Sequence, residues 1–375
     1  MQEEFSSPYI EESEAILADV LGKPLSGEER KKATIELAQN ILKEAKRIQT
    51  SKEKRQEKQL AKMMHDPIGK CFTTSMMDEC FRSRKKRRIA NQLIFLLEQL
   101  GVPSYLSFPK RMAFYFFKNL PITALALFVP LLSFMIRKEA SSLILPAKKG
   151  PLLAHIRKRK AQGVRINLNH LGEAILAEKE AEERVNEYLV DLEKEEIEYV
   201  SIKISAIFSQ IHLLGWEKTS HLIAERLRML YRAAIKHPTV DKKGNSVPKF
   251  INLDMEEYRD LILTKEIFKE VLEEKEFENL PAGIVLQAYI PDSFEIQKEL
   301  THWAKERVKK GHAPIKIRIV KGANLAMEQV ESSIRGWKQA PYTAKIEVDA
   351  NYKKNDPLWI FKRECRSSPY WCCFP

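Results

Sequence analysis

Hydrophobic residues recur at helical spacing through the first 155 residues of the chain. Apolar side chains return every three or four positions at Ala33, Leu37, Ile41, Ala45 and Ile48, which is the period of an amphipathic helix. Ser26 and Glu29 form an S-x-x-E capping box before this run. The segment 91–100 is also amphipathic and is followed by Gly101 and Pro103, which end helices. We expect residues 1–155 to form an N-terminal arm and an all-helical domain.

A different pattern begins near residue 156, after a basic segment at 148–163 that we interpret as the domain boundary. Runs with strand character lie at 164–168, 199–205, 250–254, 283–289 and 315–322, and charged helical segments lie near 171–196, 215–237, 256–277 and 292–310. Repeated units of this kind form a parallel sheet, either a barrel or a doubly wound sheet. No GxGxxG follows the first run, which disfavours the doubly wound form. We predict an α/β fold over 156–354, an incomplete (β/α)8 TIM-type barrel of about five strands with a longer loop at 241–248.

Residues 121–136 contain no charged side chain and are flanked by Lys118 and by Arg137 and Lys138. A membrane-spanning helix needs about 20 apolar residues, so this stretch is too short. It also contains Pro130. A buried helix, or a pair of short ones, is the favoured interpretation, and an interfacial segment with basic flanks is the second.

The formal net charge of +12 raises the question of an anionic partner. Basic residues cluster at 82–88 and 148–160. No helix-turn-helix, zinc-ligand or ribonucleoprotein motif accompanies them, so no specific nucleic acid is expected. Cys71 and Cys80 stand alone in the body of the chain, without CxxC spacing. A metal site or a disulfide framework is therefore disfavoured, and a reducing cytoplasm fits best.

Polar residues occur at the predicted strand ends, where barrel enzymes carry their active residues. They are His170, Glu173, Lys203, Asp254, Gln287, Arg318 and Lys321. A polar side chain in a buried strand needs a partner or a ligand, because desolvating it alone costs several kcal/mol. An internal salt bridge such as Lys203 with Asp254 is the structural alternative. The recurrence of such residues at equivalent barrel depths favours a site.

These same segments carry a resemblance to a known family. YVSIKIS, FINLDMEE, GIVLQAYIPD and IRIVKGANLAMEQVE, then GWKQAPYTAKIEVDANYKK, resemble the proline dehydrogenase domain of the bifunctional proline utilization A flavoproteins. RINLNHLGEAIL resembles the first strand of that domain and the entry into its first helix. The resemblance runs in order from about residue 160 to residue 354.

The resemblance implies an FAD-dependent enzyme that oxidises L-proline to pyrroline-5-carboxylate by hydride transfer to the flavin. Lys203 matches the lysine that pairs with the substrate carboxylate. Asp254 matches the aspartate that orients substrate-binding arginines, and Arg318 matches the arginine near the flavin's reactive nitrogen, so both are expected to be catalytic. Cofactor contacts are implied for Met255, Gln287, Arg318, Val320, Lys321, Gly322 and Ala323, and for Thr343 and Lys345 at the distal part of FAD. Cations near a flavin stabilise the charge that builds on it.

The resemblance also implies a membrane quinone as electron acceptor, and a cytoplasmic protein with peripheral contact to the inner membrane. The family's sixth to eighth strands, the arginine pair on its last helix and the aldehyde dehydrogenase half have no counterpart in the chain. We therefore expect little or no activity from the chain as written. An inactive, truncated remnant is the alternative, and a basic membrane- or nucleic-acid-binding helical protein is the third hypothesis.

Residues 355–375 lose all periodicity and become rich in Cys and Trp. Shifted forward by one nucleotide, the codons of 355–361 permit Met-Ile-His-Tyr-Gly-Phe, and those from Pro369 permit His-Ile-Gly-Val-Ala-Ser. Both strings resemble the continuation of the family's sequence. We interpret this tail as the product of a frameshift near codon 355, real or a sequencing error, with a divergent terminus as the alternative. Resequencing the locus tests this.

Overall fold

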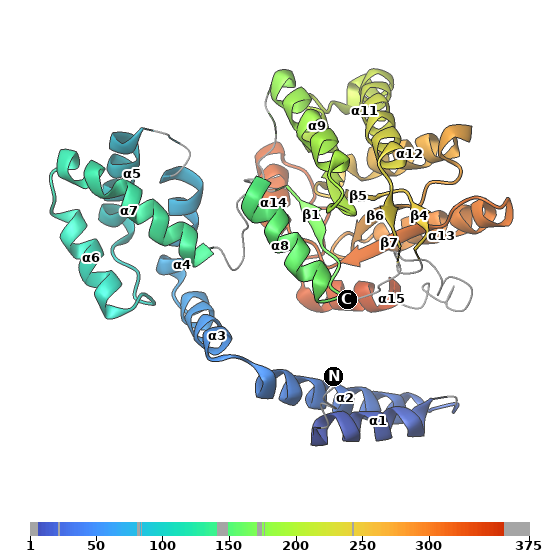
Figure 1. Ribbon diagram of the computed structural model, residues 1–375, viewed down its shortest axis with the longest axis horizontal. Coiled ribbons are helices and arrows are strands. Elements are labelled where there is room, and N and C mark those ends of the chain that lie inside the picture. The colour runs from blue at the N-terminus through green and yellow to red at the C-terminus, as the bar shows by residue number, and fades with distance from the viewer. Residues whose placement is uncertain are drawn as a thin grey trace. The chain divides into compact units, whose positions relative to one another are not determined.

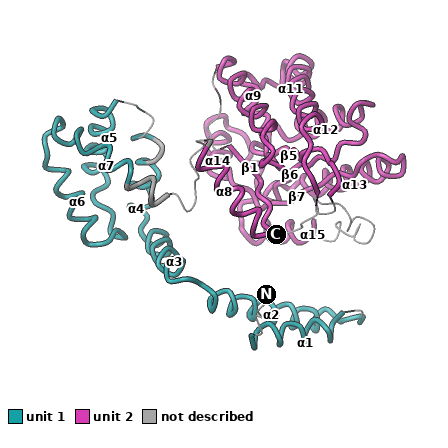
Figure 2. The backbone as a smooth tube through the Cα atoms, in the orientation of Figure 1, with its two compact units in different colours: residues 1–145 teal, residues 146–375 magenta. Residues whose placement is uncertain are grey.

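The computed structural model describes residues 7–21, 23–80, 83, 85–140, 149–170, 175, 177–241 and 244–355. The chain divides into two compact units, residues 1–145 and 146–375 (Figure 2). Glu173, and the tail beyond residue 355 on which the frameshift hypothesis rests, lie outside the described residues. The domain limits drawn from the sequence remain a prediction beside these two units.

The first unit is helical, as the hydrophobic pattern predicted. Its helices are α1 (Pro8–Val20), α2 (Gly27–Ile48), α3 (Ser51–Met64), α4 (Pro67–Ser75), a π-helical turn (Met76–Cys80), α5 (Lys86–Leu100), α6 (Phe108–Lys118) and α7 (Ile122–Ala140). The predicted capping box is confirmed at the start of α2. The Glu29 amide donates to Ser26 Oγ at 3.3 Å, and the Ser26 amide donates to Glu29 Oε2 at 2.9 Å. These bonds satisfy two backbone groups that a helix end leaves open.

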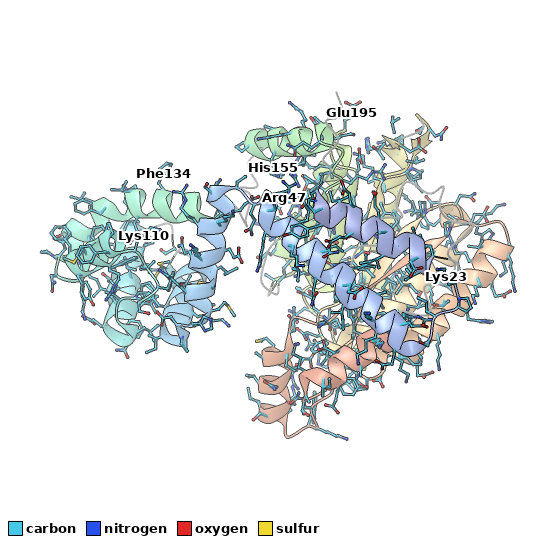
Figure 3. The ribbon with its side chains drawn as sticks, turned by 90° about the horizontal axis from the view of Figure 1, so that it is seen from below. Lys23, Arg47, Lys110, Phe134, His155 and Glu195 are labelled. Carbon is cyan, nitrogen blue, oxygen red and sulfur yellow. The ribbon has the colours of Figure 1, made fainter. Side chains whose placement is uncertain are left out.

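Helix α7 is a single helix that includes Pro130, and it is buried on one side. Leu125, Val129 and Leu132 join the core formed with α4 and α5. Phe134 projects from the other side and is 63% exposed (Figure 3). The expectation of a buried helix therefore holds for the side that carries Leu125, Val129 and Leu132, whereas the side that carries Phe134 is exposed. In the described part of the chain, no helix is both long enough and apolar enough to cross a membrane.

The second unit alternates strands and helices (Figure 1). Its strands are β1 (Asn167–Asn169), β2 (Tyr199–Lys203), β3 (Thr239–Val240), β4 (Ser246–Val247), β5 (Phe250–Asp254), β6 (Ala282–Gln287) and β7 (Ile315–Val320). Its longer helices are α8 (Lys149–Ala161), α9 (Glu178–Glu193), α11 (Trp216–Lys236), α12 (Leu261–Glu273), α13 (Ser293–Lys309), α14 (Leu325–Arg335) and α15 (Lys345–Asn355). Short helical turns are α10 (Ile204–Ile207) and three 3₁₀ turns at Leu213–Gly215, Tyr258–Asp260 and Lys275–Phe277.

Five strands form one parallel sheet in the order β1-β2-β5-β6-β7. All five predicted strand segments contribute to it. Each strand is followed by a helix before its neighbour, so every connection is a crossover. Every residue of β6 is buried, whereas β1 and β7 at the sheet edges are partly exposed. Helices α9, α11 and α12 lie side by side along the sheet (Figure 1), and their apolar faces complete the core around Tyr188, Tyr231 and Phe268.

Two segments differ from the sequence prediction. The basic stretch interpreted as a boundary forms helix α8, because Leu152, Leu153 and Ile156 lie on one face and join the core of the second unit. The predicted loop at 241–248 contains strand β4, which pairs antiparallel with β3. Asp241 closes this hairpin by accepting hydrogen bonds from the Asn245 amide and side chain.

Candidate active site

The carboxyl ends of the five parallel strands meet at one edge of the sheet. Lys203 and Asp254 are direct neighbours in the pairing of β2 with β5. Leu253 pairs with Ile284, and Val285 pairs with Arg318. Asp254 and Arg318 therefore lie at one level of the sheet, with β6 between them. Side chains at one level of a parallel sheet point to the same side, so the register alone brings three predicted site residues together.

The Asp254 carboxylate is the centre of a hydrogen-bond network. Its Oδ1 accepts from Arg318 Nη2 at 2.7 Å, Asn252 Nδ2 at 2.7 Å and Ser201 Oγ at 3.3 Å, and its Oδ2 accepts from Asn169 Nδ2 at 3.3 Å. The donors come from strands β1, β2, β5 and β7. Its side chain is only 11% exposed, so the negative charge is held by fixed donors more than by water.

Arg318 reaches over β6 to make this ion pair. The strand that carries it lies at the sheet edge, and the Arg318 side chain keeps 36% exposure. Arg318 is thus more exposed than its position between two isoleucines predicted. Its Nε is nevertheless buried and has no hydrogen-bond partner in the part of the chain that the structure describes. The guanidinium is therefore held at Asp254 through Nη2, while its Nε–H is not used by any described residue.

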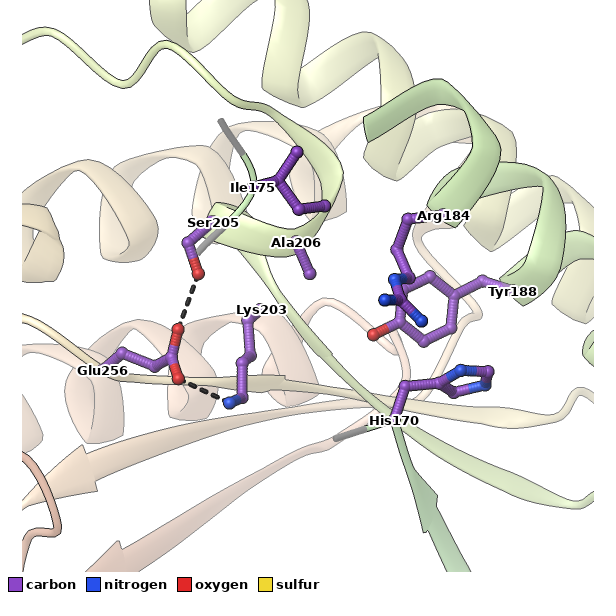
Figure 4. A pocket seen from close by; sticks show the side chains of 8 residues that line it. All are labelled: His170, Ile175, Arg184, Tyr188, Lys203, Ser205, Ala206 and Glu256. Atoms are coloured by element: carbon purple, nitrogen blue, oxygen red, sulfur yellow. Dashed lines mark hydrogen bonds and ion pairs between the residues drawn. The ribbon is translucent and has the colours of Figure 1, made fainter. Parts of the chain in front are cut away.

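Lys203 takes a different partner from the one weighed in the sequence. Its Nζ donates to Glu256 Oε1 at 2.5 Å, and Ser205 Oγ donates to Glu256 Oε2 at 2.6 Å (Figure 4). The alternative of a Lys203–Asp254 salt bridge was wrong, because the lysine side chain extends past the strand end towards the residue two positions beyond Asp254.

Lys203, Ser205 and Glu256 line a small pocket. Its other wall carries His170, Arg184 and Tyr188 (Figure 4). The pocket therefore joins the end of β1 and helix α9 to the ends of β2 and β5.

His170 is fixed in that wall. Its Nε2 lies 2.6 Å from Asp191 Oδ2, and its ring meets the Tyr188 ring edge-on at 4.7 Å. Burial alone would raise the pKa of Asp191. The hydrogen bonds from His170 and Lys194 outweigh burial and lower the pKa of that carboxyl. Burial raises the pKa of Tyr188, so its phenol stays neutral beside the pocket.

Gln287, the last residue of β6, is hydrogen-bonded to Met255, which follows β5. Gln287 Nε2 donates to the Met255 carbonyl at 2.8 Å, while Gln287 Oε1 is buried and lacks a partner among the described residues. The side chain of Met255 is buried. The amide of Gln287 thus presents one free acceptor at the carboxyl end of β6.

Gly322 brings its loop onto an aromatic ring. Its φ is +120°, and a Cβ there would lie 2.2 Å from a ring carbon of Tyr289. Only glycine fits both the backbone conformation and the contact. The strand pairing continues beneath the loop, since the Ala288 amide donates to the Val320 carbonyl at 2.7 Å and the Tyr289 amide donates to the Lys321 carbonyl at 2.9 Å.

The remaining predicted residues form a separate, exposed group near the start of α15. Lys321 and Lys345 both pair with Asp349, and Ala323, Thr343 and Lys345 are exposed. The structure therefore brings Lys203, Asp254, Met255, Gln287 and Arg318 into one site and places Lys321, Ala323, Thr343 and Lys345 on the adjoining surface, while Val320 packs against the core.

Several residues of this site were not found from the sequence. They are Asn169, Arg184, Ser201, Ser205, Asn252 and Glu256. Asn252 and Glu256 stand two residues either side of Asp254, so the two-residue period of a strand was a signal for them. Arg184 gave no such signal, because it lies in a charged helix where solvated arginines are common.

A family comparison gives this geometry a context. The family model described as "Proline dehydrogenase" matches residues 152–364, more than half of the chain and all of the sheet. The chain belongs to the proline dehydrogenase family. The five parallel strands and their helices are accordingly part of a TIM-type barrel, preceded by helices, as in other proline dehydrogenase domains.

Individual relatives agree with the proline dehydrogenase assignment. The chain is 26% identical to proline dehydrogenase 2 of Bacillus subtilis over 203 residues, which cover 53% of this chain and 54% of that protein. It thus spans about half the length of the curated relatives it matches.

Two solved structures share the arrangement. Proline utilization A of Corynebacterium freiburgense matches at 42% identity and a TM-score of 0.54, over 60% of this chain and 23% of that chain. The enzyme of Bdellovibrio bacteriovorus, inactivated by N-propargylglycine, matches at 28% identity and a TM-score of 0.55, over 80% and 32%.

Proposed function

We propose that this member of the family oxidises L-proline to pyrroline-5-carboxylate in proline catabolism, with FAD as its cofactor. The observation that carries the proposal is the Asp254–Arg318 ion pair, set beside Lys203 at one level of the sheet in a proline dehydrogenase domain. In this arrangement Lys203 is placed to bind a carboxylate, and Arg318 is a second cation, which Asp254 holds in position. That pairing suits an anionic substrate that reacts beside a redox group.

The residues present fit a flavin. Gln287 Oε1 offers a buried acceptor and Arg318 Nε a buried donor, and both lack partners within the described residues. Gly322 keeps its loop flush against Tyr289, so backbone groups can approach a planar ring closely. We infer that Met255, Gln287 and Arg318 contact the ring portion and that the loop of Val320, Lys321, Gly322 and Ala323 also contacts the cofactor. Thr343 and Lys345 hold the distal portion.

FAD, when bound, supplies the acceptor for the hydride that leaves the proline ring. The protein's part is binding and orientation. Lys203 pairs with the substrate carboxylate as a compact positive charge. Asp254 holds Arg318 in one position, and Asn252, Ser201 and Asn169 hold Asp254 in turn, so no reorganisation is needed when charge develops.

The electron acceptor beyond the flavin is proposed to be a membrane quinone, reached from the cytoplasm by peripheral contact with the inner membrane. The exposed apolar side of α7, with Leu127, Leu131 and Phe134, supports that contact. Vesicle sedimentation of the chain with anionic lipid, compared with a Phe134→Ser variant, tests it. Equal pelleting of the two proteins would count against α7.

Flavin reduction in a single turnover tests the main proposal. The purified chain is loaded with FAD, freed of excess cofactor and mixed anaerobically with L-proline. We expect retained flavin whose visible absorbance falls with L-proline but not with D-proline, and no fall with Lys203→Met. N-propargylglycine, named as the inactivator of the Bdellovibrio relative, should block the change. Failure to retain FAD would instead support the inactive-remnant hypothesis.

A further inference from the structure

The ammonium group assigned to the substrate carboxylate already has a carboxylate of its own. Glu256 Oε1 lies 2.5 Å from Lys203 Nζ, and its second oxygen accepts from Ser205 Oγ at 2.6 Å. This is how a bound carboxylate would be held, with one oxygen on a cation and the other on a hydroxyl. Lys203 and Glu256 both line the pocket (Figure 4).

The backbone of Glu256 is fixed while its side chain is free to leave. Its carbonyl accepts from Asn324 Nδ2 at 3.2 Å and from Gln287 Nε2 at 3.4 Å. The side chain keeps 29% exposure, and that of Lys203 keeps 21%. A carboxylate with this access to solvent can turn outward and be hydrated, which leaves Lys203 for an incoming carboxylate to pair with.

The rest of the pocket favours an anion once Glu256 has turned away. Arg184 lies on the opposite wall with 22% of its side chain exposed, and its partner Glu187 is 56% exposed. His170 is directed to Asp191, which is already neutralised by Lys194. Lys203 and Arg184 would then be the charged groups facing the hollow among the described lining residues.

We propose that Glu256 is an internal substitute for the substrate carboxylate, which must displace it from Lys203 and Ser205, with Arg184 as a second cation for the incoming group. The inference rests on the proposed function. Glu256 is a positioning residue here. It holds the Lys203 ammonium in place before substrate arrives, and it sets an affinity threshold that only a carboxylate able to replace it can pass.

The expected change in affinity follows from competition between Glu256 and the incoming carboxylate for Lys203. If the closed Lys203–Glu256 pair is favoured about tenfold over the open state, the apparent affinity for a carboxylate falls about tenfold. Glu256→Gln keeps the shape of the side chain but removes the competing charge. It should therefore bind carboxylates about tenfold more tightly.

Two probes of equal shape, one charged and one uncharged, test this inference on the full chain. Cyclopentanecarboxylate and cyclopentanecarboxamide are titrated against the protein by ligand-observed NMR. We expect Glu256→Gln to tighten binding of the carboxylate and not of the carboxamide, and Arg184→Gln to weaken the carboxylate alone. Glu257→Gln makes the same charge change at the adjacent residue, which does not line the pocket, and serves as the matched control.

The outcomes separate this inference from the proposed function. Weaker or unchanged carboxylate binding in Glu256→Gln overturns the inference, even if the chain oxidises proline. Tighter binding in a chain that shows no proline-dependent flavin reduction supports the inference and counts against the function. If Glu256→Gln does not fold, Glu256→Asp provides the same test. Its side chain is one methylene shorter and cannot reach Lys203 and Ser205 together, so it too should bind the carboxylate more tightly.

Discussion

Removing the charge of Asp254 should destabilise the second unit more than removing that of Arg318. Asp254 accepts four hydrogen bonds and is 11% exposed, whereas Arg318 is 36% exposed and donates one of those bonds. Asp254→Asn replaces one acceptor oxygen by a donor that faces other donors. We expect a loss of about 2–4 kcal/mol in the free energy of unfolding. Arg318→Met removes one of the four hydrogen bonds and a guanidinium that is itself 36% exposed, and three donors to Asp254 remain, so about 1 kcal/mol is expected.

Tryptophan fluorescence in urea measures this unit by itself. All five tryptophans, from Trp216 to Trp371, lie in the second unit, and the first unit contains none. The double variant should show a coupling of about 1 kcal/mol between the two positions, since part of the Asp254 loss is the same ion pair. The reasoning is refuted if Arg318→Met costs as much as Asp254→Asn, or if the two losses simply add.

Three further predictions concern groups around the sheet. Arg307→Lys should cost about 3–5 kcal/mol in urea unfolding, because the buried guanidinium donates to four backbone carbonyls and one ammonium cannot serve them all; a loss below 1 kcal/mol would contradict this. Gly322→Ala should cost about 2–4 kcal/mol and lower FAD retention, because its Cβ would meet Tyr289. Gly311→Ala is the control, since its φ is also positive, +84°, but nothing lies within 4 Å. Burial lowers the pKa of Lys249 to about 8. Between pH 8 and the ordinary pKa of lysine, the unfolded chain therefore binds more protons than the folded chain. The free-energy cost of burying the charged ammonium falls as the pH rises, so the folded protein becomes more stable. Relative to Lys249→Met, the native protein should gain about 2 kcal/mol between pH 7.5 and 9.5. A pH-independent difference between the two proteins would disprove the buried-charge argument.

The strands were predictable because their apolar runs are short and uninterrupted. FINLD was predicted at the bounds that β5 has, since every residue but its last is buried. The bounds of β1 were shifted, because Val164 is exposed at the sheet edge and local sequence gives no sign of which strand will be outermost. The sequence pattern did not predict that the basic segment forms helix α8, because only Leu152, Leu153 and Ile156 among its many basic residues pack into the core.

The site was predictable as a set of residues but not as a set of partners. The level shared by Lys203, Asp254 and Arg318 follows from strand order and register. Which anion each cation contacts depends on side-chain reach. Lys203 extends to Glu256, and Arg318 crosses β6 to Asp254. Such distances exist only after the sheet has formed, so the pattern of charges along the chain could not give them.

The four donors of Asp254 have a thermodynamic consequence. They span residues 169 to 318 in the sequence and come from both outer strands and two inner ones. A molecule that binds at Asp254 or Arg318 should therefore stabilise the pairing of all these strands at the same time. Saturating the site should therefore slow amide hydrogen exchange at Asn169 and Ile319, at opposite margins of the sheet, by similar factors.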